Sequence, residues 1–174
     1  MLSTHFSWDQ YFITMAYLAS MKSKDTRTRV GAVIVGDENS VLSTGYNGLP
    51  RGILDRKSRY EDKDYRAQAL NHAEENAILN CALHGIATKD TRLYTLWIPC
   101  SRCARTIIQA GIKEVIFDAN FPGNDEYNLS EEDKISIQIS HELLTEADIK
   151  LRSYDGPVIE IDGLYKGKSF KLQK

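Results

Sequence analysis

The chain's 174 residues, 42% of them hydrophobic, predict a single domain over 1–174, with a core at about 8–153 and a tail at 154–174. Its formal net charge of −2 argues against a binder of polymeric nucleic acid, no apolar run approaches the roughly 20 residues that cross a membrane, and the first residues lack a signal-peptide pattern. Its three cysteines form no disulfide framework, so the expected compartment is the reducing cytoplasm, or the host cytoplasm for a viral protein.

The first part of the chain predicts a helix followed by a β-hairpin. A capping-box sequence and apolar residues at helical spacing predict a helix over about 8–22. Two apolar segments, 30–35 and 41–46, flank a polar turn and predict the two strands of the hairpin. The Asn-Gly-Leu-Pro sequence that follows ends the second strand in a turn. The polar stretch 51–70 lacks helical or strand periodicity and predicts a long functional loop.

In the second part, predicted helices and strands alternate. Asn71 is a candidate N-cap for a helix that ends near Leu83. The elements expected after it are a strand at 93–97, a helix from Pro99 to about Gly111, a strand at 115–117, a helix from Ser130 to Leu144 and a strand at 149–153. In the tail, segments 158–161 and 169–172 have modest strand character, with a turn expected at Asp162 and Gly163. This order predicts an α/β fold in which helices cover both faces of a mixed sheet.

A histidine and a pair of cysteines have the spacing of a catalytic metal site. His72 and Glu74 form a His-x-Glu motif, and Cys100 and Cys103 follow in a Pro-Cys-x-x-Cys motif. One imidazole and two thiolates give zinc three protein ligands, whereas a closed structural site normally has four, so the fourth position is left for water. This H-x-E…P-C-x-x-C pattern is the signature of zinc-dependent nucleobase deaminases.

Other candidates for a fourth ligand are less well placed. Cys81 and His84 lie on the predicted helix that follows His72, but roughly 180° and 120° around it. His5 and His141 are remote in the sequence, and no spacing favours them. An isolated Cys-x-x-Cys pair by itself would indicate a structural zinc knuckle or a redox dithiol. The upstream His-x-Glu motif and the proline before the first cysteine favour the catalytic interpretation.

Glu74 is the candidate proton shuttle of this site. Zinc lowers the pKa of a bound water from 15.7 toward about 7. A carboxylate nearby then takes a proton from the water and delivers protons to the ring nitrogen and to the departing amine. The alternative is that a glutamate at a helix N-terminus only complements the helix dipole.

Two basic clusters flank the predicted site. Their members are Lys22, Lys24, Arg27 and Arg29 before the first strand, and Arg51, Arg56, Lys57, Arg59, Lys63 and Arg66 between the second strand and the metal motif. Solvated surface charge is the ordinary interpretation, but the position of the clusters favours an anionic small ligand. A phosphate needs charge-assisted partners, so Lys24 and Arg27 are the candidates to bind it, with help from the loop 51–66.

The paired metal motifs resemble those of the cytidine and deoxycytidylate deaminase superfamily. Four segments resemble the deoxycytidylate (dCMP) deaminases within it: 23–34, 45–50, 72–78 and 107–116. The match covers most of residues 8–153. Two departures from the family pattern are Thr26, where proline is common, and Glu75, where an apolar residue is usual.

The resemblance implies a fold and an activity. The implied fold is a three-layer α/β/α sandwich with a five-stranded mixed sheet, as in cytidine deaminase. The implied activity is hydrolytic deamination of dCMP to dUMP and ammonia with one catalytic Zn²⁺. Asn47 and Ala73 are expected to contact the substrate, Asn47 through the sugar, although a turn residue before Gly48 is the alternative for Asn47. An extra zinc site found in some relatives is expected to be absent.

The resemblance also implies regulation. The expected assembly is a homo-oligomer, in particular a hexamer, activated by dCTP and inhibited by dTTP, with Mg²⁺ accompanying the triphosphate. The allosteric nucleotide is expected beside Tyr46, Asn47, Gly48 and Arg51, because glycine lets the backbone approach a ligand and Arg51 can pair with a phosphate. An ordinary hairpin exit is the alternative.

Two other classes of function remain open from the sequence. One is a different deaminase on the same scaffold, acting on tRNA adenosine, cytidine, guanine or a riboflavin precursor. The other is a non-catalytic, zinc-stabilised binding module. Glu74 argues against the second class, because a structural zinc site has no use for a carboxylate beside an open coordination position.

Overall fold

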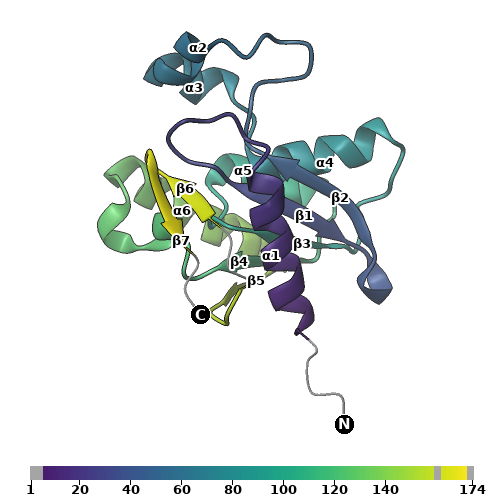
Figure 1. Ribbon diagram of the computed structural model, residues 1–174. Coiled ribbons are helices and arrows are strands. Elements are labelled where there is room, and N and C mark those ends of the chain that lie inside the picture. The colour runs from purple at the N-terminus through teal and green to yellow at the C-terminus, as the bar shows by residue number, and fades with distance from the viewer. Residues whose placement is uncertain (1–5, 159–161, 172–174) are drawn as a thin grey trace.

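The computed structural model describes residues 6–158 and 162–171, whose helices and strands form three layers (Figure 1). A five-stranded mixed sheet with the order β2-β1-β3-β4-β5 lies in the middle. Helix α1 covers one face, and α4, α5 and α6 cover the other. The bounds are α1 Trp8–Ser20, β1 Gly31–Val35, β2 Val41–Tyr46, α4 Ala73–Leu83, β3 Arg92–Thr95, α5 Ser101–Gln109, β4 Glu114–Asp118, α6 Glu131–Glu146 and β5 Lys150–Tyr154. The predicted fold class is confirmed.

The topology of the sheet decides where the site lies. β1 runs antiparallel to both β2 and β3, whereas β3, β4 and β5 are parallel. Gly31 therefore pairs with Tyr46, and Ala32 pairs with Thr95. The start of β1 and the ends of β2 and β3 consequently lie at one edge of the sheet. The loops at this edge come from three distant parts of the chain.

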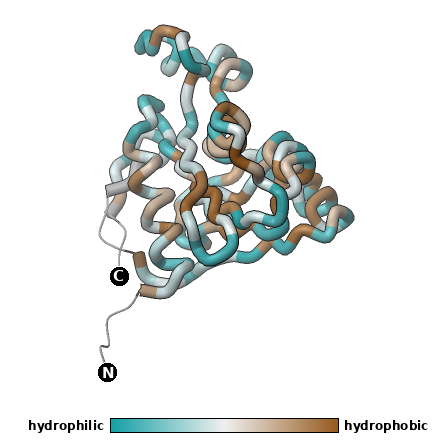
Figure 2. The backbone as a smooth tube through the Cα atoms, turned by 90° about the vertical axis from the view of Figure 1, so that its right-hand side faces the viewer, coloured by the Kyte–Doolittle hydropathy of each residue, from teal (hydrophilic) through white to brown (hydrophobic). Residues whose placement is uncertain are grey.

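The core is built around β1. All five residues of this strand are buried, because α1 packs on one of its faces and α4 on the other. Figure 2 shows the hydrophobic residues gathered in the centre of the molecule. Within the described ranges, no helix is long and apolar enough to span a membrane.

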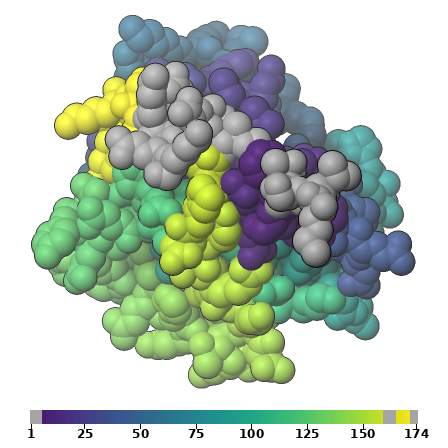
Figure 3. All heavy atoms as spheres, turned by 60° about the horizontal axis from the view of Figure 1, so that its bottom comes forward, coloured from purple at the N-terminus to yellow at the C-terminus, as the bar shows by residue number. Residues whose placement is uncertain are grey.

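Ion pairs join helix α1 to β5, the outermost strand on one side of the sheet. Arg152 on β5 donates two hydrogen bonds to Asp9, at 2.7 and 2.9 Å, and a third to Glu114 at 2.8 Å. The Arg152 guanidinium lowers the pKa of Asp9 below its usual range. Figure 3 shows the yellow-green residues around β5 beside the purple N-terminal helix.

The segment 51–70, predicted as a loop, contains two short helices, so that prediction is wrong. They are α2 (Lys57–Glu61) and α3 (Lys63–Ala69). The carboxylate of Asp62 caps α3 by accepting a hydrogen bond from Tyr65 N at 2.9 Å, and Tyr60 is buried. Helices of five and seven residues are too short for periodicity to reveal them.

Two predicted helix starts are also corrected. The N-cap of α4 is His72 rather than Asn71, which instead forms an isolated bridge with Gly48. Helix α5 begins at Ser101 with Cys100 as its N-cap, so Pro99 precedes the helix. The expected cap of α6 is confirmed, because Ser130 Oγ accepts a hydrogen bond from Asp133 N. Between β4 and α6 the chain makes two short 3₁₀ helices, Pro122–Asn124 and Glu126–Asn128.

The tail forms a second, two-stranded sheet from β6 (Asp162–Tyr165) and β7 (Lys168–Lys171). The strand expected at 158–161 falls mostly on residues 159–161, which lie outside the described ranges. The turn expected at Asp162 and Gly163 is wrong, since both residues belong to β6. The turn is made by Lys166 and Gly167, whose φ angles are 47° and 79°. The second tail strand, predicted at 169–172, corresponds to β7.

Gly45 allows helix α4 to approach the hairpin closely. A Cβ added at Gly45 would lie 2.2 Å from Ala73 O and 2.3 Å from Ala77 N, both in the backbone of α4. We therefore expect Gly45→Ala to lower the free energy of unfolding by about 1–3 kcal/mol, because α4 must move away from β2. Gly48→Ala is the matched control, since its nearest neighbours are Tyr46 ring atoms at 3.8 Å. Equal melting temperatures for the two variants would contradict this account.

Candidate active site

The fold brings the three predicted zinc ligands together. The ligand atoms of His72, Cys100 and Cys103 all lie within 4.8 Å of one another. His72 Nδ1 is 3.5 Å from Cys100 Sγ and 3.3 Å from Cys103 Sγ. His72 caps α4, Cys100 caps α5, and Cys103 follows in the first turn of α5. The site therefore forms where two helix N-termini meet at the edge of the sheet.

The cluster fits zinc in donor type and spacing. Zinc–sulfur and zinc–nitrogen bonds of usual length, set at tetrahedral angles, place the nitrogen and a sulfur about 3.6 Å apart. The observed separations of 3.3 and 3.5 Å are close to this value. Within the described ranges, Cys81, His84 and His141 are not members of the cluster, and His5 lies outside those ranges. Three protein ligands leave one tetrahedral position for water.

The pKa values of the three ligands show how protons are held before metal binds. Hydrogen bonds from Cys103 and His72 lower the pKa of Cys100 to about 3. Burial disfavours the charged form of His72, but the hydrogen bond and the charge of Cys100 outweigh it and raise its pKa to about 8. The hydrogen bond to Cys100 and burial raise the pKa of Cys103 well above the ordinary value. Metal binding must therefore displace protons from His72 and Cys103.

Glu74 lies next to the cluster without belonging to it. It is the second residue of α4 and is 4% exposed. Burial raises its pKa to about 7, although the neighbouring charge of His72 opposes that shift. A carboxyl group with a pKa near neutral pH both accepts and releases protons readily, which suits a general acid and base.

A cavity of about 350 Å³ opens beside these residues. His72, Glu74 and Cys100 line it together with Ala73, which was predicted to contact the substrate. The other lining residues are Asp25, Arg27, Thr28, Val30, Asn47, Lys63, Arg66, Ala67, Leu70, Trp97, Ile98, Asp133, Ile137 and Lys166. The volume lies in the range of small-molecule sites, and the mixture of apolar walls with a few polar groups is typical of them.

Asn47 lines the cavity with its amide held in place. Its Oδ1 accepts a hydrogen bond from Val30 N at 2.8 Å, and its Nδ2 donates to Thr28 O at 2.9 Å. A second contact from Nδ2, to Asp25 Oδ2, is long at 3.4 Å. The amide thus joins the end of β2 to the loop before β1 and retains one weakly used donor.

Of the two predicted phosphate ligands, the fold brings one to the cavity. Arg27 lines it, whereas Lys24 pairs with Asp55 and has a side chain that is 64% exposed. Lys63 and Arg66 of the second basic cluster also line the cavity, and Arg66 pairs with the buried Asp25 at 2.7 Å.

Lys166 also lines the cavity, although it was not among the predicted site residues. This lysine belongs to the C-terminal turn between β6 and β7, and no local pattern singles it out. Its backbone N donates a hydrogen bond to Thr28 Oγ1 at 3.2 Å, and Gly167 N donates to Arg27 O. The turn is thereby held against the loop that precedes β1.

The segment expected to bind an allosteric nucleotide lies against α4. Tyr46 is 40% exposed, and its carbonyl oxygen accepts a hydrogen bond from Asn76 Nδ2 at 2.7 Å. Gly48 forms its bridge with Asn71, directly before the zinc ligand His72. Arg51 donates a hydrogen bond to Asn80 Oδ1.

This chain is similar to known deaminases in sequence. The family model of the cytidine and deoxycytidylate deaminase zinc-binding region matches residues 6–119. The deoxycytidylate deaminase of Homo sapiens is 35% identical over 178 residues, which cover 97% of this chain and 94% of the human protein. That of Mus musculus is 40% identical over 133 residues, covering 74% of this chain and 71% of the mouse protein.

A solved structure shares the fold. The dCMP deaminase of the cyanophage S-TIM5, in complex with dCMP and dUMP, matches with a TM-score of 0.63 and 22% identity, covering 86% of this chain and 100% of the other. At this identity the match bears on the architecture alone. The matching family model, the extent of the human relative and the zinc-type cluster together show that this chain belongs to the cytidine and deoxycytidylate deaminases, a family of zinc-dependent enzymes.

Proposed function

We propose that this protein hydrolyses dCMP to dUMP and ammonia. One observation carries the proposal: His72 and Cys100 of the metal cluster and the buried Glu74 line the same cavity as the cationic residues Arg27, Lys63 and Lys166. A nucleoside needs no such cations, whereas a nucleotide phosphate does. The relatives that match over most of their length are deoxycytidylate deaminases, which supports the same substrate.

Glu74 performs the proton transfers in the proposed mechanism. Zinc, when bound by His72, Cys100 and Cys103, supplies the Lewis acid that makes water nucleophilic near neutral pH. Glu74 takes one proton from the attacking water and delivers it to N3 of the cytosine ring as oxygen bonds to C4. Glu74 then passes the remaining hydroxyl proton to the amino group, which leaves as ammonia and yields the uracil ring.

The walls of the cavity orient the nucleotide. Trp97, Ile98 and Leu70 offer apolar surface to the base. Asn47 donates its weakly used Nδ2 hydrogen to the sugar in place of the long contact with Asp25, and Ala73, fully buried at the start of α4, limits the space beside the ring. Arg27, Lys63 and Lys166 bind the phosphate, while Arg66 neutralises Asp25 and keeps that carboxylate from repelling it.

Regulation, assembly and location belong to the same proposal. dCTP activates and dTTP inhibits, each with Mg²⁺, by binding beside Tyr46, Asn47, Gly48 and Arg51. The bridge between Gly48 and Asn71 supports this idea, because a shift of the turn reaches the start of α4 directly. The enzyme is a homo-oligomer, specifically a hexamer, and works in the cytoplasm, where thiolate ligands stay reduced.

The first prediction concerns Glu74. Glu74→Gln should leave one zinc per chain but lower kcat by about 10²–10⁴-fold or more, because the amide cannot shuttle protons. Cys100→Ala is the comparison variant and should lose zinc and activity together. Zinc content and turnover of dCMP are measured on the same samples. A Glu74→Gln enzyme with normal kcat would exclude the assigned role.

The second prediction concerns the phosphate. Arg27→Gln and Lys63→Gln should lower kcat/KM for dCMP by about 10- to 100-fold, the loss expected for a hydrogen bond to a charged group, and leave deoxycytidine turnover little changed. Lys24→Gln is the control, because Lys24 pairs with Asp55 and does not line the cavity. The substrates of the alternative deaminases, which are cytidine, guanine, a riboflavin precursor and tRNA, are assayed in parallel. Equal losses on dCMP and deoxycytidine would show that Arg27 and Lys63 do not bind the phosphate.

The third prediction concerns the effectors. With Mg²⁺ present, dCTP should shift the dCMP saturation curve to lower concentration and dTTP to higher concentration, and dCMP should alter effector affinity by the same factor. Arg51→Gln should weaken both responses without changing kcat. A saturation curve that neither triphosphate moves would refute the regulatory proposal and leave the deaminase proposal standing.

A further inference from the structure

Glu75, one of the two departures from the family pattern, joins the two halves of the zinc site. Its Oε2 accepts a hydrogen bond from the backbone N of His72 at 2.9 Å. Its Oε1 accepts a hydrogen bond from Arg102 Nε at 2.7 Å. Arg102 lies between Cys100 and Cys103 in the first turn of α5. A single carboxylate therefore holds the backbone of one ligand residue and the segment that carries the other two.

We propose that Glu75 and Arg102 form a strap that sets the separation of the His72 and cysteine halves of the zinc site. Neither side chain lines the substrate cavity, so the two act through the ligands and not on the nucleotide. Glu75 is 9% exposed, which shields its carboxylate from competing water, whereas the Arg102 side chain is 36% exposed. The inference rests on the zinc cluster and is independent of which nucleotide is deaminated.

The electrostatics of two converging helices explain why a strap is useful. Both α4 and α5 direct their N-termini at the metal cluster, and the positive ends of their dipoles repel each other. Arg102 adds a full positive charge to the start of α5, where a cation is disfavoured. Glu75 lies in the first turn of α4 and offers the opposite charge to both. Partners just outside a metal's ligands typically change metal affinity by about 10–100-fold when removed.

A simpler explanation is that Glu75 is only an N-cap partner, because it completes a capping box with His72. In that case Arg102 would be dispensable for the metal. The variant Glu75→Gln separates the two roles, since the amide oxygen still accepts from His72 N but carries no charge for Arg102. Arg102→Leu removes the other end of the strap and leaves the capping box intact.

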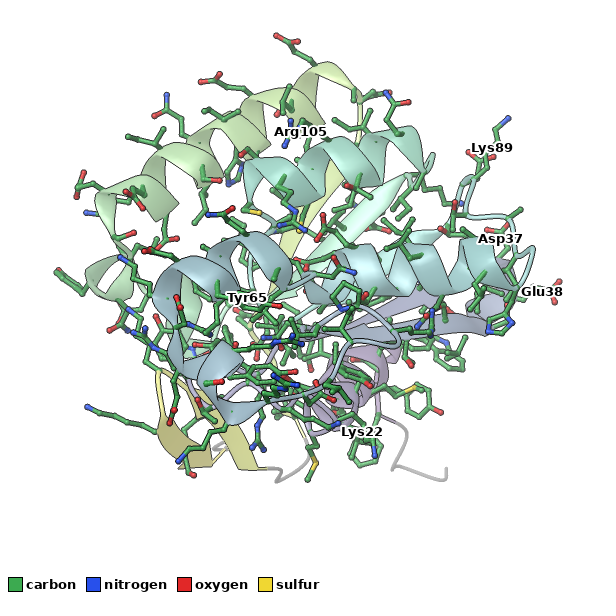
Figure 4. The ribbon with its side chains drawn as sticks, turned by 90° about the horizontal axis from the view of Figure 1, so that it is seen from above. Lys22, Asp37, Glu38, Tyr65, Lys89 and Arg105 are labelled. Carbon is green, nitrogen blue, oxygen red and sulfur yellow. The ribbon has the colours of Figure 1, made fainter. Side chains whose placement is uncertain are left out.

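The experiment measures metal binding without nucleotide. Zinc affinity is determined by competition with a chromogenic chelator, and the absorption spectrum of the Co²⁺-substituted protein reports ligand geometry. The variants are Glu75→Gln, Glu75→Leu, Arg102→Leu and the double variant Glu75→Leu with Arg102→Leu. Arg105→Leu is the matched control, because Arg105 lies on the same helix and is exposed (labelled in Figure 4). Melting temperatures of the metal-free proteins show that each variant is folded.

We expect Glu75→Leu and Arg102→Leu each to lower zinc affinity by about 10–100-fold and to shift the cobalt spectrum in the same way. The double variant should lose no more than the worse single variant, since the pair acts as one unit. Arg105→Leu should match the unaltered protein. Wild-type zinc affinity and an unshifted spectrum in Arg102→Leu, or additive losses in the double variant, would overturn the strap. If Glu75→Leu does not fold, Glu75→Gln and Arg102→Leu decide the question.

Discussion

The meeting of two helix N-termini at one edge of the sheet is the constraint on which the rest of the site depends. His72 ends one segment and begins α4, while Cys100 and Cys103 begin α5 on a separate crossover. No single segment holds all three donor atoms, so the cluster exists only because β1, β2 and β3 place both helix starts at the same edge. A register error in the hairpin would therefore separate the ligands without changing any of them.

This arrangement has a chemical advantage and an electrostatic cost. The side-chain hydrogen bonds from Cys103 and His72 lower the pKa of Cys100 most, and the backbone N–H of Cys103 at the helix start lowers it further. Glu74, in the first turn of α4, lies beside the cluster and is buried there, which raises its pKa to about 7. The cost is the repulsion between two positive helix ends, and it is offset by Glu75, whose carboxylate contacts both helices.

The residues that line the cavity come from two sources. Some belong to the metal motifs, and the others, called the rim here, come from the loop before β1, the short helix α3 and the C-terminal turn. The buried Asp25 organises this rim, because its carboxylate accepts hydrogen bonds from Arg27 N at 2.7 Å and Arg66 Nη2 at 2.7 Å. The same loop also holds Asn47 and the turn that contains Lys166. Three segments far apart in the sequence thus share one set of polar contacts.

The sequence alone predicted the histidine and the two cysteines that the fold brings together and the main helices and strands, because these depend on local spacing or on short-range periodicity. The mixed sheet followed from the order of those elements. The sequence did not reveal α2 and α3, whose few turns show no periodic apolar face, nor the turn at Lys166 and Gly167. It singled out Lys24 and Arg27 together, yet only the tertiary structure could separate them, by pairing Lys24 with Asp55 and placing Arg27 at the cavity. Ligand identity is a property of residue type and spacing, whereas the position of a long cationic side chain depends on partners from distant segments, which only the folded chain brings near.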